Sequence, residues 1–380
     1  MVLGMVATAC RILVAAGAIA LSAGCASKLD NVFIPIEDSI ALASNAARVE
    51  MLVATTRKPS DVPGEMFGGD RGEASFAEIT VSVPPNHKPG AVEWPTKLPA
   101  DPETSFATVK ADFMGREQVI ALFNKRLAKE PSRSVLVFVH GYNNRFDDAV
   151  FRFAQIVHDS GTRAVPVLFT WPSRGGLLAY GYDKDSATYS RDALERLLGY
   201  LIADKAVNEI SIMAHSMGNW VTLETLRQMS IRNKGLSPKI QNVLLADPDV
   251  DIDIFRTQVL EMGEKRPDFT VFISDDDKAL AASKILWGST ARLGAIDPTD
   301  PNYAAFLHQH RIHVVNMSGI ETDDRMNHGK FAESPEVIQL IGRQLATGQV
   351  ISDAKTASAG DSVNLLTASM VSAGGALTGK

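Results

Sequence analysis

The sequence predicts an α/β fold, in which helices cover both faces of a mostly parallel, doubly wound sheet. From Ser134 onward, short apolar runs typical of buried strands alternate with segments of helical periodicity. The last of these helices opens with Ser334 and Pro335, a cap followed by proline at the first helical position. The composition agrees, because 45% hydrophobic and 22% charged residues are ordinary for a globular chain.

The expected elements begin with antiparallel strands and continue as the alternating pattern. One strand is expected from Glu50 and another over Phe76–Val83, where Pro84 and Pro85 end it. A proline-rich connection over residues 89–104 precedes a helix over Phe113–Lys129. Further strands are expected at Ser134–Val139, Val165–Phe169, from Glu209 to the turn at Ser216, Ile240–Leu245, Phe269–Ser274 and Ile312–Val315, with helices from Phe146, over Ser186–Ile202 and directly after Ser216.

The first two dozen residues have the pattern of an export signal. After Arg11, an apolar run from Ile12 to Ala23 leads to Gly24 and Cys25, and this run is too short to span a bilayer. Its ending resembles the lipobox of bacterial lipoproteins, which implies that Cys25 is the site of lipid attachment and anchors the chain to a membrane. Cys10 would leave with the signal, so no disulfide is expected within the mature chain.

Four segments are therefore expected. Residues 1–24 form a lipoprotein signal peptide, 25–48 a tether, 49–346 the α/β domain and 347–380 a flexible tail rich in Ala, Ser, Gly and Thr. The resemblance implies a protein exported to the bacterial cell envelope, and Ala26 after the cysteine favours the outer membrane. Simple secretion and an uncleaved anchor are the alternatives. The net charge of −6, without basic clusters, argues against nucleic acid as a partner.

Ser216 is the candidate nucleophile. It lies between an apolar strand and a helix, a turn that exposes the hydroxyl and aims the first helical N–H groups at the same space. The two backbones come close at such a turn, so the residues two before and two after the serine must be small. They are Ala214 and Gly218, a pattern that departs from G-x-S-x-G by one methyl group.

The loops after later strands supply a candidate base and a candidate acid. His328 is the only histidine in the loop after the last expected strand. The preceding strand ends in Asp275, Asp276 and Asp277, of which Asp277 is the predicted triad acid and Asp275 the alternative. The third acid, Asp276, is expected to be a solvated turn residue, and Asp249 is a weaker candidate in another loop.

An oxyanion on the attacked carbonyl needs two N–H donors. The backbone N–H groups of Met217 and Tyr142 are the candidates, the second in a loop where Gly141 allows close approach. His140 is expected to support this loop, and His215 to point away from the turn. Aromatic side chains expected near the pocket are Tyr180, Tyr182 and Trp287.

The candidate residues and the motifs around them resemble those of a known family. The order Ser216, Asp277, His328, with VATTR, VLVFVHGYNN, FTWPSRG, AHSMGN and NHGKF, resembles the alpha/beta-hydrolase superfamily, and more narrowly the bacterial esterase/lipase-like hydrolases of unknown function, several of which are lipoproteins. The resemblance covers roughly Glu50 to Leu345. It implies the alpha/beta-hydrolase fold for residues 49–346 and a Ser-His-Asp triad, but it brings no established substrate.

The predicted function is a serine hydrolase of carboxylic esters, small-molecule or lipid, that acts through an acyl-enzyme on Ser216. A phospholipase or amidase with the same triad is one alternative, and a membrane-anchored binding or scaffold protein without turnover is another. No cofactor or metal is expected: the alternating aspartates from Asp247 lack the glycine and glutamate of a calcium loop, and the histidines from His308 to His313 lack partner ligands at metal spacing. The oligomeric state stays open.

Overall fold

The computed structural model describes residues 29–287, 290–347 and 364–366. In this part of the chain the strands form one ten-stranded sheet in the order β10-β9-β8-β7-β6-β4-β5-β1-β2-β3. The strands are β1 (Ala47–Pro59), β2 (Phe67–Val83), β3 (Ala107–Met114), β4 (Ser134–Val139), β5 (Val165–Thr170), β6 (Glu209–His215), β7 (Ile240–Ala246), β8 (Asp268–Ile273), β9 (Ile312–Asn316) and β10 (Asn364–Leu366).

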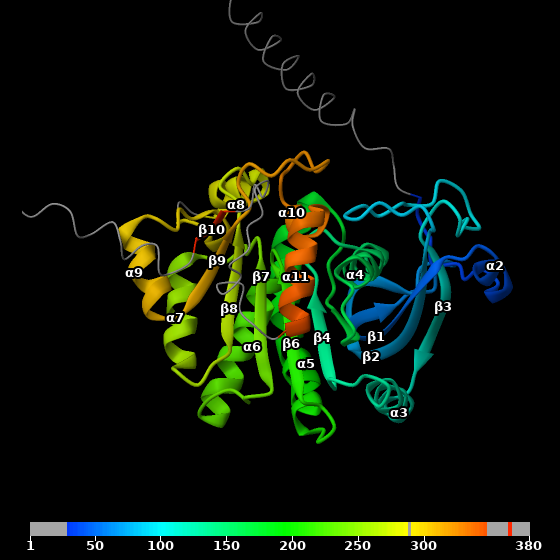
Figure 1. Cartoon of the computed structure of the whole chain (residues 1–380), viewed down its shortest axis with the longest axis horizontal. Coiled ribbons are helices and arrows are strands. Elements are labelled where there is room, and N and C mark those ends of the chain that lie inside the picture. Colours follow the sequence, from blue (N-terminus) through cyan, green and yellow to red (C-terminus); the bar gives the residue numbers. More distant parts are fainter. Residues whose placement is uncertain (1–28, 288–289, 348–363, 367–380) are drawn as a thin grey trace, which may run out of the picture.

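The helices cover both faces of the sheet (Figure 1). They are α2 (Asp38–Ala43), α3 (Arg116–Leu127), α4 (Phe146–Ser160), α5 (Tyr180–Ala203), α6 (Gly218–Asn233), α7 (Ile252–Met262), α8 (Lys278–Trp287), α9 (Pro301–Gln309), α10 (Lys330–Glu333) and α11 (Pro335–Thr347), with the 3-10 turns η1 (Leu177–Ala179) and η2 (Leu293–Ala295). The predicted mostly parallel, doubly wound α/β architecture is confirmed.

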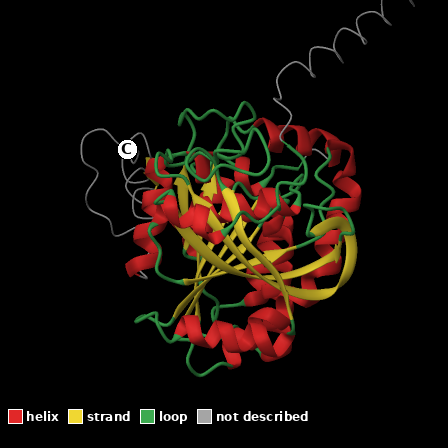
Figure 2. Cartoon of the chain, turned by 90° about the vertical axis from the view of Figure 1, so that its right-hand side faces the viewer, coloured by secondary structure: helices red, strands yellow, loops and turns green. Residues whose placement is uncertain are grey.

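The strand pairing is parallel from β1 through β5, β4, β6, β7 and β8 to β9, whereas β2 and β3 add antiparallel strands at one edge and β10 adds one at the other. The chain passes from β4 to β5 on one side and later to β6 on the other, so the strand order reverses at β4. Ligand sites of open α/β sheets lie at the carboxyl ends of the strands beside such a reversal. Figure 2 shows the loops gathered along this upper edge of the sheet.

Strand β4 illustrates why its sequence is continuously apolar. Val135, Val137 and Val139 pack into the core beneath α3, α5, α6 and α7. Leu136 and Phe138 face the opposite core, which α4 and α11 cover. Side chains alternate between the faces of a strand, so a strand covered on both sides needs apolar residues at every position.

Three expectations about the elements were wrong. Strand β3 was not predicted, and Phe113 and Met114, assigned to a helix, belong to it; α3 begins after Gly115. β3 is an edge strand whose outer half is largely exposed, so it lacks the apolar run that reveals a strand. Helix α5 begins at Tyr180, whereas the prediction began at Ser186. The first turns were missed because they are polar and lack the apolar periodicity on which the prediction depended.

The expected signal peptide, residues 1–24, and Cys25 lie outside the described residues. Of the expected tail, Asn364–Leu366 is described and pairs with β9 as β10, while 348–363 and 367–380 are outside the described part. The four-segment division therefore stays a prediction. Within the described ranges, no helix combines the length and the apolar character needed to cross a bilayer.

Candidate active site

Ser216 occupies the sharp turn between β6 and α6. Its backbone φ is +51°, in the left-handed region that a non-glycine residue seldom adopts and that nucleophile turns use. The Ser216 N–H donates to Ala246 O at 3.0 Å, and the Asn219 side chain donates to Ser216 O and Ala246 O at 3.0 and 2.9 Å. Ala214 is buried between β4 and β7, where its methyl group is accommodated.

Two glycines permit the close approach around the serine. A Cβ at Gly218 would lie 2.4 Å from His140 O, because α6 starts against the end of β4. A Cβ at Gly141 would lie 2.8 Å from Ser216 Cβ. The loop after β4, which carries the Tyr142 N–H, therefore lies directly against the candidate nucleophile.

The structure brings His328 and Asp277 together. His328 Nδ1 and Asp277 Oδ2 are 2.6 Å apart; the carboxylate is buried and the imidazole is 19% exposed. Asp275, the alternative acid, is exposed and donates its backbone N–H to Ser318. Within the described residues no hydrogen bond joins Ser216 Oγ to His328, and catalytic hydrogen bonds often tighten only when substrate binds.

His215 contacts the candidate base, so the expectation that it points away was wrong. Its Nε2 donates to His328 O at 2.9 Å, the two rings are 4.8 Å apart, and its ring also stacks on Phe331. Burial and the neighbouring His328 lower the pKa of His215 well below its usual value, so the neutral ring is the hydrogen-bond donor. The residue beside the nucleophile thus supports the backbone of His328.

Two acidic side chains shape the loop that carries His328. Asp324 accepts hydrogen bonds at 2.9, 2.6 and 3.0 Å from the backbone N–H groups of Met326, His328 and Gly329. Asp276 is an exposed turn residue, as expected, with 40% of its side chain exposed, and it also pairs with Lys330 Nζ at 2.6 Å. The Lys330 side chain is fully buried. A buried ammonium requires such a partner. The ion pair joins the acid-bearing loop to the base-bearing loop.

Carboxylates dominate the electrostatics of His328. Burial opposes the charged imidazolium, but the hydrogen bond and charge of Asp277 and the charges of Asp247 and Asp249 outweigh burial. Together they raise the pKa of His328 to about 9.

Asp247 is a buried acid near His328, and the sequence predicted no role for it beyond the rejected calcium pattern. It follows β7 with φ +42°, and neither carboxyl oxygen has a hydrogen-bond partner among the described residues. Burial raises the pKa of Asp247 well above its usual value, although the charge of His328 opposes this. The position of Asp247 at the carboxyl end of a strand could have marked it in the sequence as a residue of the site. Its lack of hydrogen-bond partners could not be predicted from the sequence.

Asp249, the weaker candidate acid, is bonded elsewhere. It accepts a hydrogen bond from Tyr180 Oη at 2.7 Å, and the Tyr180 ring packs edge-on against Tyr142 at 5.2 Å. Tyr180 therefore lies near the site, as expected. Tyr182 instead packs beneath Arg174 and donates to the β2 backbone, and the side chain of Trp287 lies outside the described part.

His140 supports the candidate oxyanion loop. Its Nδ1 donates to Gly141 O at 2.9 Å, while its Nε2 accepts from the Trp171 N–H at 3.1 Å. The ring stacks on Trp171, whose indole N–H donates back to His140 O at 2.9 Å. Burial and the charge of Arg57 lower the pKa of His140 to about 3, so it stays neutral.

Arg57, the last residue of the VATTR segment, is a supporting residue whose role the sequence did not predict. It is 1% exposed, and its guanidinium donates to Thr170 Oγ1, Gly68 O, Ser173 O and Asn144 O at 2.8, 3.0, 2.8 and 2.7 Å. Burial lowers the pKa of Arg57 to about 10, which leaves it charged at neutral pH. Arg57 thereby ties the loops after β4 and β5 to the β1–β2 hairpin.

Sequence comparison identifies the family. The family model described as "Alpha/beta hydrolase of unknown function (DUF900)" matches residues 116–344, more than half of the chain. The chain belongs to this family. The uncharacterized protein alr1448 of Nostoc sp. is 29% identical over 133 residues, a match that spans 28% of this chain and 35% of that relative.

Among solved structures, the chain is similar to several esterases, at low identity and with TM-scores below 0.5. An esterase from Pyrobaculum calidifontis is 12% identical, with 81% of this chain and 88% of that one covered and a TM-score of 0.33. A fungal esterase from Rhizomucor miehei is 14% identical, with 87% and 95% covered and a TM-score of 0.35. Est1E from Butyrivibrio proteoclasticus is 8% identical, with 72% and 95% covered and a TM-score of 0.36. At these values the likeness says nothing about substrate.

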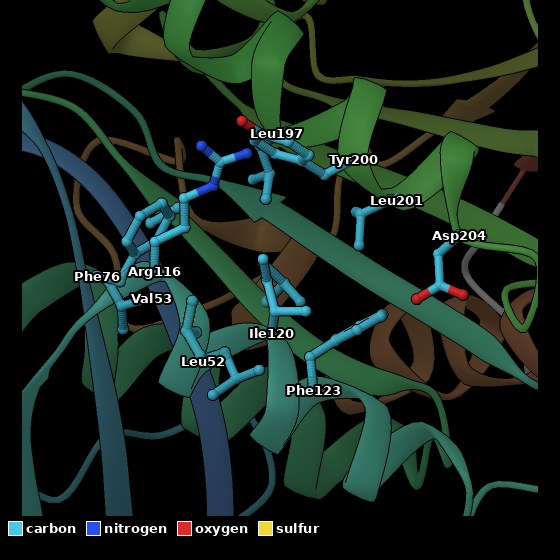
Figure 3. Close-up of a pocket in the computed structure, with 13 residues that line it drawn as sticks. Leu52, Val53, Phe76, Arg116, Ile120, Phe123, Leu197, Tyr200, Leu201 and Asp204 are labelled. Carbon is cyan, nitrogen blue, oxygen red and sulfur yellow. The ribbon is translucent and has the colours of Figure 1, made fainter.

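Two further features of this alpha/beta hydrolase lie outside the candidate active site. An apolar cavity of about 150 Å³ lies between α3, α5 and the sheet, and Figure 3 shows Ile120, Phe123 and Leu201 pointing into it. None of its lining residues belongs to the candidate triad. We regard it as a gap beneath two helices, because it is smaller than the usual ligand pocket.

The second feature is a group of potential metal ligands. Among the described residues, the ligand atoms of His87, His158 and Asp159 lie within 4.8 Å of one another. His87 is already bonded on both ring nitrogens, to Glu93 at 2.7 Å and Asp159 at 2.8 Å. The arrangement is that of an imidazolium between two carboxylates.

Proposed function

We propose that the protein is a serine hydrolase of carboxylic esters, with Ser216 as nucleophile, His328 as general base and Asp277 as the acid that orients it. One observation carries the proposal. Ser216 occupies a left-handed turn, the ring of the adjacent His215 lies 4.8 Å from the ring of His328, and His328 pairs with Asp277 at 2.6 Å. The three residues of the proposed triad follow the carboxyl ends of three different strands.

The geometry supports a two-step reaction. Ser216 Oγ attacks the ester carbonyl carbon while its proton passes to His328 Nε2, and His328 then returns the proton to the departing alcohol. A water molecule, deprotonated by the same nitrogen, attacks the acyl-serine and releases the acid. Asp277 holds Nδ1 and stabilises the imidazolium at both stages.

The negative oxygen of each tetrahedral intermediate needs donors already in place. The Met217 N–H stands at the N-terminus of α6, and the Tyr142 N–H follows Gly141, which touches Ser216. Loss of one such donor typically costs about 3 kcal/mol of transition-state stabilisation. The neutral His140 and the buried Arg57 hold the loop that supplies the second donor.

The test is covalent labelling by a fluorophosphonate probe, which reports an activated serine. Labelling that requires both Ser216 and His328, and is absent in Ser216→Ala and His328→Ala, is the expected result. Labelling that persists in Ser216→Ala would refute the nucleophile. If the wild-type chain is not labelled and hydrolyses neither short nor long acyl esters, the non-catalytic scaffold is the better description. Faster turnover of amides than of matched esters would indicate an amidase.

The cellular context belongs to the same proposal. Acylated Cys25 would anchor the mature chain to the bacterial cell envelope, most simply to its outer membrane. The partners would then be an ester substrate, small or lipid, and the membrane itself. Incorporation of labelled palmitate in the wild type and its loss in Cys25→Ser is the expected outcome, and incorporation that survives the substitution would contradict the anchor.

A further inference from the structure

The most exposed large apolar side chains of the described residues lie at the catalytic edge. Leu178, Ile285 and Leu177 are 103%, 84% and 78% exposed, and the next, Leu42, is 64% exposed. Leu177 and Leu178 form η1 after β5, and Ile285 lies in α8 after β8, so all three follow carboxyl ends of strands. We call these three residues the apolar rim.

Hydrogen bonds fix the apolar rim beside the candidate site. The Tyr142 hydroxyl donates to Leu177 O at 2.5 Å, and Tyr142 directly follows the glycine that touches Ser216. On the other side, Tyr180 Oη and Ser283 Oγ are 3.3 Å apart, which joins the start of α5 to α8, two residues before Ile285. Figure 1 shows α8 at the same end of the sheet as α10, which follows His328.

The N-terminal chain reaches the domain at this same edge. Asp30 pairs with Arg145, and the Phe33 ring packs on the Phe146 ring at 5.2 Å. Arg145 precedes α4 and lies four residues after Gly141. Leu29 lies four positions after Cys25, so a lipid on Cys25 would hold Leu29 within roughly 14 Å of a bilayer surface.

The net charge of the protein favours a zwitterionic bilayer over an anionic one. The formal net charge is −6, so an anionic membrane surface would repel the domain as a whole. Insertion of apolar side chains among zwitterionic headgroups needs no attraction between charges. A zwitterionic surface therefore fits the rim better than an anionic one.

We propose that the apolar rim docks on a zwitterionic phospholipid bilayer, with Leu177, Leu178 and Ile285 inserted, so that ester-linked lipids of that bilayer are the substrate class of the site. The docking stands on exposure and on the position of the N-terminal chain. The substrate class rests on the proposed function as well.

Insertion can be measured without catalysis. Cys10 and Cys25 are the two cysteines of the chain, so the full chain with Cys10→Ser and Cys25→Ser accepts a single engineered thiol. A polarity-sensitive fluorophore on Leu178→Cys should shift to the blue with phosphatidylcholine vesicles and be quenched by brominated phosphatidylcholine. The matched control is Leu260→Cys, an exposed position at the end of α7, where neither change is expected.

Hydrolysis gives the second measurement. In the full chain, Leu177→Ser/Leu178→Ser/Ile285→Ser should lower the ratio of vesicle-lipid hydrolysis to soluble-ester hydrolysis by about tenfold for each side chain withdrawn. Leu42→Ser/Ile231→Ser/Leu260→Ser, on exposed positions of α2, α6 and α7, should leave this ratio unchanged.

The outcomes separate the two proposals. Equal responses of the labels at 178 and 260 would overturn the docking, even if soluble esters are cleaved. A blue shift at 178 that grows with protein concentration without vesicles would also overturn it, since a second copy of the chain would then cover the rim. Insertion at 178 without hydrolysis of any ester would leave the docking intact and overturn the proposed function.

Discussion

Replacing Asp277 by asparagine tests the electrostatics of the candidate site most directly. Asp277 lies 2.6 Å from His328 Nδ1 and is the main contributor that raises the pKa of His328 from 6.5 to about 9. That difference corresponds to about 3 kcal/mol in favour of the imidazolium. Asparagine keeps the shape of the side chain but removes the charge.

The substitution should change both the pH dependence and the rate. In the wild type, kcat/KM should increase with pH, and the midpoint of this increase should lie near pH 9, because only the neutral imidazole accepts the serine proton. In Asp277→Asn, burial opposes the charged form with less compensation, so the midpoint should fall to about 6.5 or below. The maximal rate should fall roughly 10³- to 10⁴-fold, since the imidazole loses its fixed tautomer.

The assay is steady-state hydrolysis of a soluble ester across the pH range that spans both midpoints. Asp275→Asn is the matched control, because this exposed neighbour does not contact His328. Its midpoint should stay at the wild-type value. A midpoint near 9 that survives Asp277→Asn would show that the reasoning about this pair is wrong.

Stability should follow the same titration. A pKa raised in the folded state contributes stability that is fully present below the unfolded value of 6.5 and is lost as pH rises through about 9. The wild-type Tm should therefore fall across this interval by more than the Tm of Asp277→Asn does, as a thermal melt at each pH can measure.

Three other predictions follow from single contacts. Gly141→Ala places a methyl group 2.8 Å from Ser216 Cβ, so kcat should drop by roughly 10²- to 10³-fold while circular dichroism stays native; near-normal kcat would contradict the packing. Asp276→Ala leaves the buried Lys330 ammonium without its carboxylate partner and should lower the free energy of unfolding in urea by about 3 kcal/mol. Lys330→Met leaves only a partly exposed carboxylate and should lower it by less. The reverse order would refute the conclusion that the buried charge is that of Lys330. Burial opposes the charged form of His87, but hydrogen bonds to Asp159 and Glu93 outweigh burial and raise the pKa of His87. The charged His87 should therefore stabilise the fold below about pH 6.5, and this stabilisation should be lost above the raised pKa. His87→Gln should abolish that part of the dependence of Tm on pH.

The sequence was most informative where local and tertiary requirements agree. Strand β4 was predicted with both its ends correct, because a strand covered on both faces is apolar at every position. The turn at Ser216 was visible since the strand, the serine and Gly218 are adjacent in the chain. The expectation that the loops bearing Asp277 and His328 converge came from a general property of parallel sheets.

Prediction failed where long-range pairing decides. The exposed outer half of β3 is a strand because β2 offers it hydrogen bonds, and no periodicity in Phe113 or its neighbours reveals that partner. Asp276 is exposed as predicted, but its ion pair was missed, since its partner Lys330 is 54 residues away and gives no local sign of being buried. The unpartnered state of Asp247 is likewise a property of the assembled loops.

The family model begins at residue 116, yet Arg57 precedes it. Its guanidinium reaches Asn144 O and Ser173 O from a hairpin that lies wholly outside the shared region. A fragment trimmed to the family boundaries would therefore leave two carbonyls without their donor, directly behind the loop that carries Tyr142. Efforts to minimise, transplant or circularly permute this hydrolase must keep the antiparallel extension, because one arginine in it makes the extension part of the working unit.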